Sequence, residues 1–206
     1  IDDGMVEGPR MIPSAHAIGI TGGHCDDTGW APGVNELSWR DGVADGIDEA
    51  VKAVRYQIKH GAKVIKVCAT AGVLSFEGSL GAQQLSDAEL QAIVQEASRH
   101  GLKVAAHAHG TEGIKAAVRA GVASIEHGSM LDDEAIDLMK RRGTYLVPTA
   151  YLLTTFKFES LPPPIAAKAR QVVPLAQESH RKAIRAGVKI AFGTDAAVYP
   201  HGDNAR

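Results

Sequence analysis

The chain has 206 residues, of which 45% are hydrophobic and 22% charged, and its 22 basic and 24 acidic residues give a net charge of −2. This balance is typical of a globular domain, and it gives no electrostatic reason to expect a nucleic-acid or anionic-membrane partner. No apolar run is long enough for a transmembrane helix. The two cysteines, Cys25 and Cys68, fit a reduced, cytoplasmic compartment.

Short β-branched runs alternate along the chain with longer amphipathic runs that often end in glycine. The pattern predicts strands at residues 17–21, 63–67, 103–106, 123–126, 145–148 and 189–192. It predicts helices at residues 48–60, 86–100, 112–120, 132–142 and 165–186. A capping box of Ser86 and Glu89 opens the second helix, and Pro174 is expected to kink the last one. Residues 70–84 are expected to form a long loop.

Alternation of strands and helices favours an α/β fold with a parallel sheet. A complete (β/α)8 barrel takes ~250 residues, so six strands in this length suggest a partial TIM-type barrel with about six of its eight strands. We therefore expect residues 1–206 to be one barrel domain, a fragment that lacks the first strands and the C-terminal part. A doubly wound open sheet is the alternative, but the chain contains no dinucleotide or phosphate-loop fingerprint that would support it.

Polar residues gather where the predicted strands finish: His24, Lys66, His107, His109, His127 and Asp195. Side chains alternate along a strand, so Lys63 and Lys66 point to opposite faces, and Lys66 shares the inner face with Val64. In a parallel barrel all these strand ends meet on one face, where active sites are built. A single histidine after a strand is usually an ordinary loop residue, but three of them with an aspartate favour a divalent-metal site.

Four segments carry a resemblance to a known family: residues 64–72 (VIKVCATAG), 105–110 (AAHAHG), 124–128 (SIEHG) and 191–196 (AFGTDA). In this order and spacing they resemble the amidohydrolase superfamily, most closely its imidazolonepropionase-related branch, which includes metal-dependent Xaa-Pro dipeptidases (prolidases). The resemblance covers nearly the whole chain. The Gly-Thr-Asp motif is weak alone, whereas the four segments together are a specific signal.

The resemblance implies two divalent metal ions, with zinc as the expected metal, inside the barrel. Lys66 would be carboxylated by carbon dioxide and bridge the metals, His107 and His127 would bind the second metal, and Asp195 would bind the first and handle protons. His109 is expected on the substrate side or in support of the ligands. The family's His-x-His pair is missing before Lys66, which fits a sequence that lacks its first strand.

The function implied is hydrolysis of a peptide or amide bond, in an Xaa-Pro or related dipeptide or an N-acyl amino acid. A metal-activated hydroxide would attack the carbonyl carbon, and Asp195 would act first as base and then as acid. We expect His24, His109 and Tyr151 to bind the substrate, although Tyr151 could equally pack on Leu152 and Phe156. Two alternatives remain: a cyclic-amide hydrolase of the imidazolonepropionase or hydantoinase type, and a non-catalytic barrel without metals. A homo-oligomer is left open.

Overall fold

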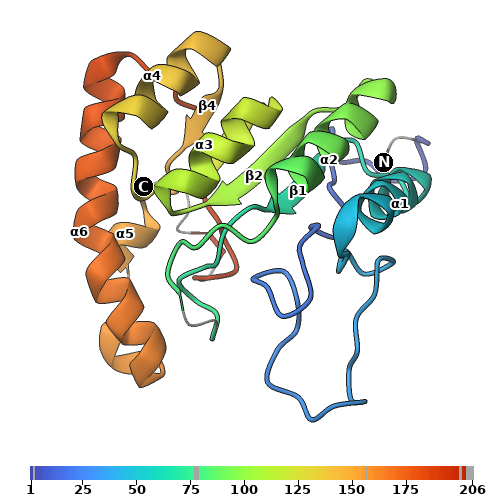
Figure 1. Ribbon diagram of the computed structural model, residues 1–206, viewed down its shortest axis with the longest axis horizontal. Helices are drawn as coiled ribbons and strands as arrows, with labels where there is room; N and C mark the ends of the chain where they lie inside the picture. Colours follow the sequence, from blue (N-terminus) through green and yellow to red (C-terminus); the bar gives the residue numbers. More distant parts are fainter. Residues whose placement is uncertain (2, 77–78, 156, 200, 203–206) are drawn as a thin grey trace.

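A parallel sheet forms the centre of the computed structural model, which describes residues 1, 3–76, 79–155, 157–199 and 201–202. Its strands are β1 (Ile65–Cys68), β2 (Val104–Ala108), β3 (Ser124–His127) and β4 (Tyr145–Val147), and they lie side by side in sequence order (Figure 1). Every pairing is parallel, with Cys68 opposite His107 and His107 opposite Glu126. The parallel α/β fold class expected from the sequence is therefore confirmed.

The sheet continues at both edges through single bridges. Ile18 pairs in parallel with Val67 of β1, and Ile190 pairs in parallel with Leu146 of β4. The predicted strands at 17–21 and 189–192 are thus present only as isolated bridges, because each forms few ladder hydrogen bonds; Gly19 also pairs in parallel with Val43 on its other side. Six parallel segments follow one another in chain order, as in an arc of a (β/α)8 barrel.

Helices connect successive strands, and the predicted ones shift by only a few residues. Within the described residues they are α1 (Gly46–Lys59), α2 (Asp87–Arg99), α3 (Thr111–Ala120), α4 (Asp133–Arg142), α5 (Leu152–Thr155), the 3-10 helix η1 (Phe158–Ser160) and α6 (Pro163–Ala186). The capping box of Ser86 and Glu89 is formed as predicted, and Pro174 lies inside α6. None of these helices in the described part of the chain combines the length and apolar character needed to cross a bilayer.

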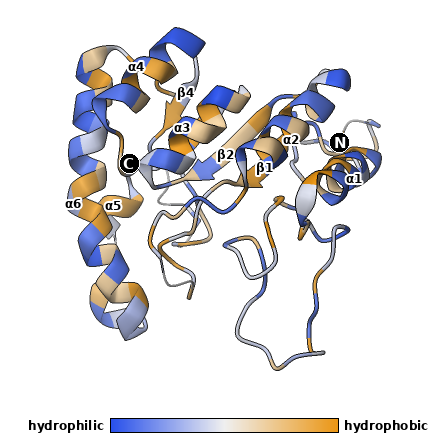
Figure 2. Cartoon of the chain, in the orientation of Figure 1, coloured by the Kyte–Doolittle hydropathy of each residue, from blue (hydrophilic) through white to orange (hydrophobic). Residues whose placement is uncertain are grey.

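The two faces of the sheet differ in chemistry. Residues such as Ile65, Val67 and Ile125 point to one face, where they are buried in the main hydrophobic core. Helices α1 to α4 pack in sequence on one another against the sheet (Figure 1), and Figure 2 shows hydrophobic colour concentrated on the strands. The alternate residues, among them Lys66 and His107, point to the opposite face, which is the inner side of the barrel arc. Helix α6, at the left of the view in Figure 1, packs on α5 and η1.

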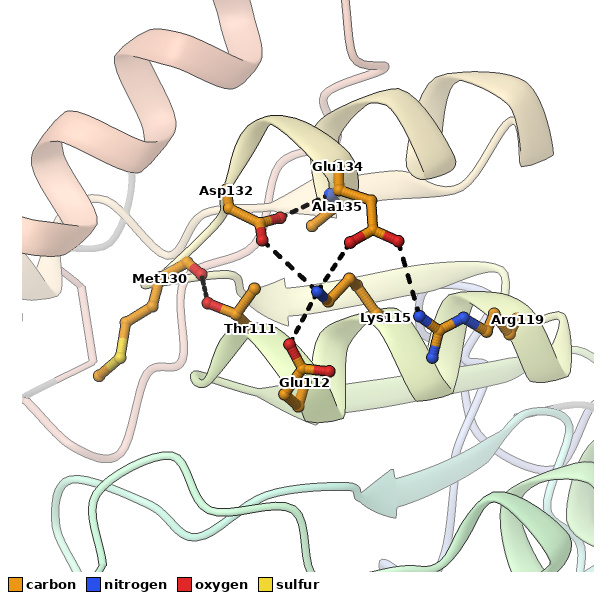
Figure 3. A network of polar contacts seen from close by, with 8 residues as sticks. All are labelled: Thr111, Glu112, Lys115, Arg119, Met130, Asp132, Glu134 and Ala135. Atoms are coloured by element: carbon orange, nitrogen blue, oxygen red, sulfur yellow. Dashed lines mark hydrogen bonds and ion pairs between the residues drawn. The ribbon is translucent and has the colours of Figure 1, made fainter.

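A buried lysine joins α3 to α4 on the outside of this arc (Figure 3). Lys115 Nζ lies 2.7 Å from Glu112, 2.9 Å from Glu134 and 3.5 Å from Asp132, and its side chain is only 8% exposed. Hydrogen bonds to Glu112 and Glu134 raise the pKa of Lys115 above its ordinary value. The ammonium therefore stays charged, and it neutralises acidic residues that belong to two neighbouring helices.

A buried carboxylate plays the corresponding role between α1 and α2. Glu96 is 2% exposed and lies 2.6 Å from Arg55 Nε, 2.8 Å from Arg99 Nη1 and 3.4 Å from His100 Nε2. The hydrogen bond from Arg55 is the main reason that the pKa of Glu96 falls to about 2. Because its folded pKa is below its ordinary value of 4.5, Glu96 stabilises the fold above pH 4.5 and loses that contribution as the pH falls toward 2.

We predict that Glu96→Gln lowers the free energy of unfolding at pH 7 by about 1 kcal/mol, the scale of an ion-pair network whose arginines are exposed to water. The difference from the unsubstituted protein should shrink as the pH falls toward 2. Urea unfolding at pH 7 and at acid pH measures both effects. Glu178→Gln, at an exposed ion pair on α6, is the control and should change little. If Glu96→Gln lowers the free energy of unfolding equally at every pH, the stabilising role of the Glu96 charge is contradicted.

Candidate functional site

The carboxyl ends of the strands surround a cavity of about 280 Å³. Its polar lining is His24, Lys66, Cys68, His107, His109, His127, Ser129, Thr149, His180 and Asp195. Its apolar lining is Val73, Leu74, Pro148, Leu152, Leu153, Val172 and Val198. Of the seven site residues expected from the sequence, the structure brings six into this cavity, and Tyr151 is the exception.

Three histidines form the centre of the polar side. One ring nitrogen from each of His107, His109 and His127 lies within 4.8 Å of the others, so the three could hold a metal ion. The ring of His107 meets those of His109 and His127 edge-on, at centroid distances of 4.7 and 4.9 Å. His109 therefore lies as close to the two expected ligands as they lie to each other.

Hydroxyl groups lie within hydrogen-bond distance of Nδ1 in two of these rings. His109 Nδ1 lies 2.7 Å from Ser129 Oγ, and His127 Nδ1 lies 2.8 Å from Thr149 Oγ1. When Nδ1 carries the proton and Nδ1–H donates a hydrogen bond to the hydroxyl, Nε2 keeps a free lone pair. This tautomer is the one that binds a metal through Nε2. His107 Nε2 is buried and has no hydrogen-bond partner among the described residues.

Burial sets the charge state of the histidines. Desolvation lowers the pKa of His107 and His127 well below the usual value, and it lowers the pKa of His109 to about 3. The neighbouring imidazoles push the pKa values of His107 and His127 in the same direction. All three rings are therefore neutral at physiological pH, as metal ligation requires.

Lys66 and Asp195 bring opposite charges to the same cavity. Burial lowers the pKa of Lys66, and the nearby carboxylates of Glu126 and Asp195 oppose that shift. Burial raises the pKa of Asp195, and the charge of Lys66 opposes it. The inward orientation of Lys66 is thus confirmed, since Lys66 lines the cavity while Lys63 is exposed.

His24 is held against the cluster from several directions. Its ring stacks on that of His107 at 4.1 Å, and its Nδ1 lies 2.9 Å from Ser75 Oγ. Its backbone N–H donates to Gln84 Oε1 at 3.0 Å. A Cβ on Gly72 would overlap the His24 ring, so the loop can pass this close only because residue 72 is glycine.

Tyr151 occupies a different place from the one expected for a substrate ligand. Its ring meets that of Tyr199 at 5.0 Å, and it lines a neighbouring cavity rather than the histidine cavity. The adjacent Leu152 and Leu153 reach the histidine cavity instead. Phe156, which was the alternative packing partner, lies outside the described residues.

The cysteines differ from the sequence expectation. Cys25 and Cys68 form a disulfide, with their Cα atoms 6.0 Å apart, a separation typical of such bonds. The expectation of two reduced thiols is therefore wrong for this structure, because the chain folds two positions 43 residues apart into contact. The bond links the loop that carries His24 to β1, which carries Lys66.

Sequence reasoning missed Ser129, Thr149 and His180 as members of the site. Ser129 and Thr149 each follow a strand by two residues, a position that could have identified them. His180 lies within α6 and reaches the site only through the tertiary fold, with its Nε2 donating to the His127 carbonyl at 2.6 Å. Thr149 and His180 contact His127, an expected ligand, and Ser129 contacts His109.

Comparison with known proteins identifies one family and several similar proteins. The sequence matches the amidohydrolase family over residues 3–205. Ochratoxinase from Aspergillus niger is 38% identical over 213 residues, covering 96% of this chain and 44% of that protein. Its crystal structure superimposes with a TM-score of 0.84 over 94% of this chain and 48% of that one, also at 38% identity.

Two further crystal structures are similar. A Xaa-Pro dipeptidase with methionine bound in its active site is 42% identical, with a TM-score of 0.91 over 98% of this chain and 52% of that one. A prolidase complexed with N-methylphosphonate-L-proline is 37% identical, with a TM-score of 0.80 over 94% and 50% of the two chains. The chain spans about half the length of these relatives.

The disulfide leads to a direct test. We predict that the denatured protein reacts with iodoacetamide at neither cysteine until a reductant is added. Cys25→Ser should lower the free energy of unfolding by about 2–4 kcal/mol, because the bond restricts the unfolded chain. In excess reductant the variant and the unsubstituted protein should be equally stable, which provides the control. Free thiols in protein that has never been reduced would contradict the pairing.

Proposed function

This chain belongs to the amidohydrolase family, and from that premise we propose that it supplies metal ligands to a hydrolase that cleaves an amide bond. The observation that carries the proposal is the shared cavity of Lys66, His107, His127 and Asp195. Two imidazoles, one carboxylate and a lysine that would bind metal once carboxylated come from four separate segments of the chain. A non-catalytic barrel would have no need to bury them together.

The residues present fit a metal. His107 Nε2 is a buried polar atom without a hydrogen-bond partner among the described residues, and an ion would satisfy it. The neutral imidazoles and the carboxylate of Asp195 suit zinc, the expected metal. We propose His107, His127, Asp195 and carboxylated Lys66 as ligands of two ions. When bound, such ions lower the pKa of water and polarise a carbonyl group.

Lys66 is suited to carboxylation by its burial. Carbon dioxide adds to the neutral amine, and burial favours that form by lowering the pKa of Lys66. A C–N bond forms, two of the three protons of the original ammonium leave to solvent, and a carbamate anion that keeps one N–H results. A buried amine thereby becomes a ligand of the opposite charge, which removes the cost of an unpaired ammonium in the barrel interior.

Asp195 is the proposed proton carrier. Burial raises the pKa of this carboxylate, which makes it a better proton acceptor than an exposed aspartate. It would accept the proton of the attacking water and then return it to the leaving amine. His24 and His109 face the same cavity and would form hydrogen bonds with the substrate, while Tyr151 could contribute only from the adjoining cavity.

The proposed substrate is an Xaa-Pro dipeptide or an N-acyl amino acid. The relatives include a Xaa-Pro dipeptidase, a prolidase and an ochratoxinase, which supports a small amide. An apolar wall that includes Leu152, Leu153 and Val172 faces the histidines. Such a wall would hold an apolar side chain while the polar side engages the scissile amide.

We predict that Asp195→Asn lowers kcat by about 10²–10⁴-fold, the range expected when a general base is removed. His107 and His127 remain in that variant, so much of the bound zinc should remain. Steady-state hydrolysis and metal analysis of the full-length protein measure the two effects. Asp137→Asn, on the exposed side of α4, is the matched control. Near-normal turnover in Asp195→Asn would contradict the proton role.

A substrate screen tests the reaction class. The zinc-loaded full-length protein should hydrolyse members of an Xaa-Pro and N-acyl amino acid panel in preference to hydantoins and other cyclic amides. Hydrolysis of cyclic amides alone would contradict the proposed substrate class. If a protein shown to contain zinc hydrolyses no amide of either kind, the catalytic function itself is wrong.

A further inference from the structure

His127 has a backbone conformation that side-chain-bearing residues rarely adopt. Its φ is +71°, and the N–H of Gly128 donates to the Glu126 carbonyl at 3.0 Å, so His127 is the central residue of a three-residue turn. A turn with positive φ at its centre is strained. Strain of this kind persists only when surrounding contacts enforce it.

Two side chains from other elements contact His127 at its two ends. His180 of α6 is 6% exposed, and its Nε2–H donates to the His127 carbonyl at 2.6 Å. Thr149, just after β4, places its hydroxyl 2.8 Å from His127 Nδ1. Thr149 itself has a φ of +46°, so a second strained residue places the hydroxyl that holds the ring.

We propose that His180 and Thr149 are positioning residues that together aim His127 Nε2 into the cavity. His180 fixes the backbone turn through the carbonyl. The Thr149 hydroxyl accepts a hydrogen bond from Nδ1–H of His127, which leaves the lone pair on Nε2, where a metal binds. The inference rests on the proposed function, because an aimed Nε2 matters only if it becomes a ligand.

The role of His180 can be separated from the docking of α6. The adjacent residue, Ser179, also bonds the loop after β3, where its hydroxyl accepts the Leu131 N–H at 2.9 Å. Helix α6 is further held by buried Val172, Ala176 and Ala183. Loss of the His180 bond therefore leaves the helix attached, whereas loss of the Ser179 bond loosens the same loop without touching His127.

The test uses paired variants of the full-length protein. His180→Leu removes the donor, and His180→Gln keeps an N–H at a similar reach. Thr149→Val removes the hydroxyl, and Thr149→Ser keeps it. Ser179→Ala is the control for general loosening of the loop. Zinc affinity is measured by competition with a chromophoric chelator, the His127 tautomer by ¹⁵N NMR of the metal-free protein, and stability by urea unfolding.

We expect His180→Leu and Thr149→Val each to weaken zinc binding by about 10–100-fold, as is typical when a group supporting a ligand is lost. His180→Gln and Thr149→Ser should recover most of the affinity. Thr149→Val should also increase the His127 tautomer that is protonated at Nε2. Ser179→Ala should keep the zinc affinity of the unsubstituted protein.

Two results would overturn the inference, and they differ from failure of the function. If the zinc affinity and the His127 tautomer are unchanged in His180→Leu and Thr149→Val, then His180 and Thr149 are not positioning residues. If Ser179→Ala weakens zinc binding as much as the other two substitutions do, the effect belongs to the loop as a whole. If the unsubstituted protein binds no zinc, the proposed function fails first, and with it the premise of this inference.

Discussion

Parallel pairing of the strands is the constraint on which the site depends. Because β1 to β4 run in one direction in chain order, their carboxyl ends meet at one edge, and every residue that follows a strand arrives there. The register places Cys68 opposite His107 and Ala108 opposite His127. Candidate ligands that lie far apart in the sequence are thereby brought within one cavity, and a slip of one residue would turn His107 toward the helices.

The environment of this edge changes the chemistry of the residues gathered there. Burial keeps the imidazoles neutral, favours the amine form of Lys66 and raises the pKa of Asp195. Each shift moves the group toward the form that metal ligation, carboxylation or proton transfer requires. His127, Thr149 and Asp195 also share positive φ values. Strained backbone therefore coincides with the positions that the proposed reaction needs, as is common at functional sites.

Much of this arrangement could be predicted because it is local. The alternation of β-branched and amphipathic runs identified the strands, and the capping box of Ser86 identified the start of α2. Lys66, His107 and Asp195 were found because they end or lie within strands. The lengths of the two outer strands, at residues 17–21 and 189–192, were overestimated, because β propensity does not report how many ladder hydrogen bonds a segment forms.

The remaining features depend on contacts between distant segments. The Cys25–Cys68 bond joins positions 43 residues apart, and His180 reaches His127 from a helix 53 residues further on. Neither position has a local pattern that distinguishes it from an ordinary loop cysteine or helix histidine. Tyr151 was assigned from its loop, but the direction of its ring is decided by packing on Tyr199. Oligomeric state and compartment stay predictions.

The central claim is that His107 and His127 bind the same ion at the carboxyl edge of the sheet. Zinc-edge anomalous diffraction from crystals of the full-length protein tests it most directly. The account predicts an anomalous peak about 2.0–2.1 Å from Nε2 of both residues, the usual zinc–imidazole distance. A zinc-containing crystal whose peaks all lie away from these two nitrogens would contradict it.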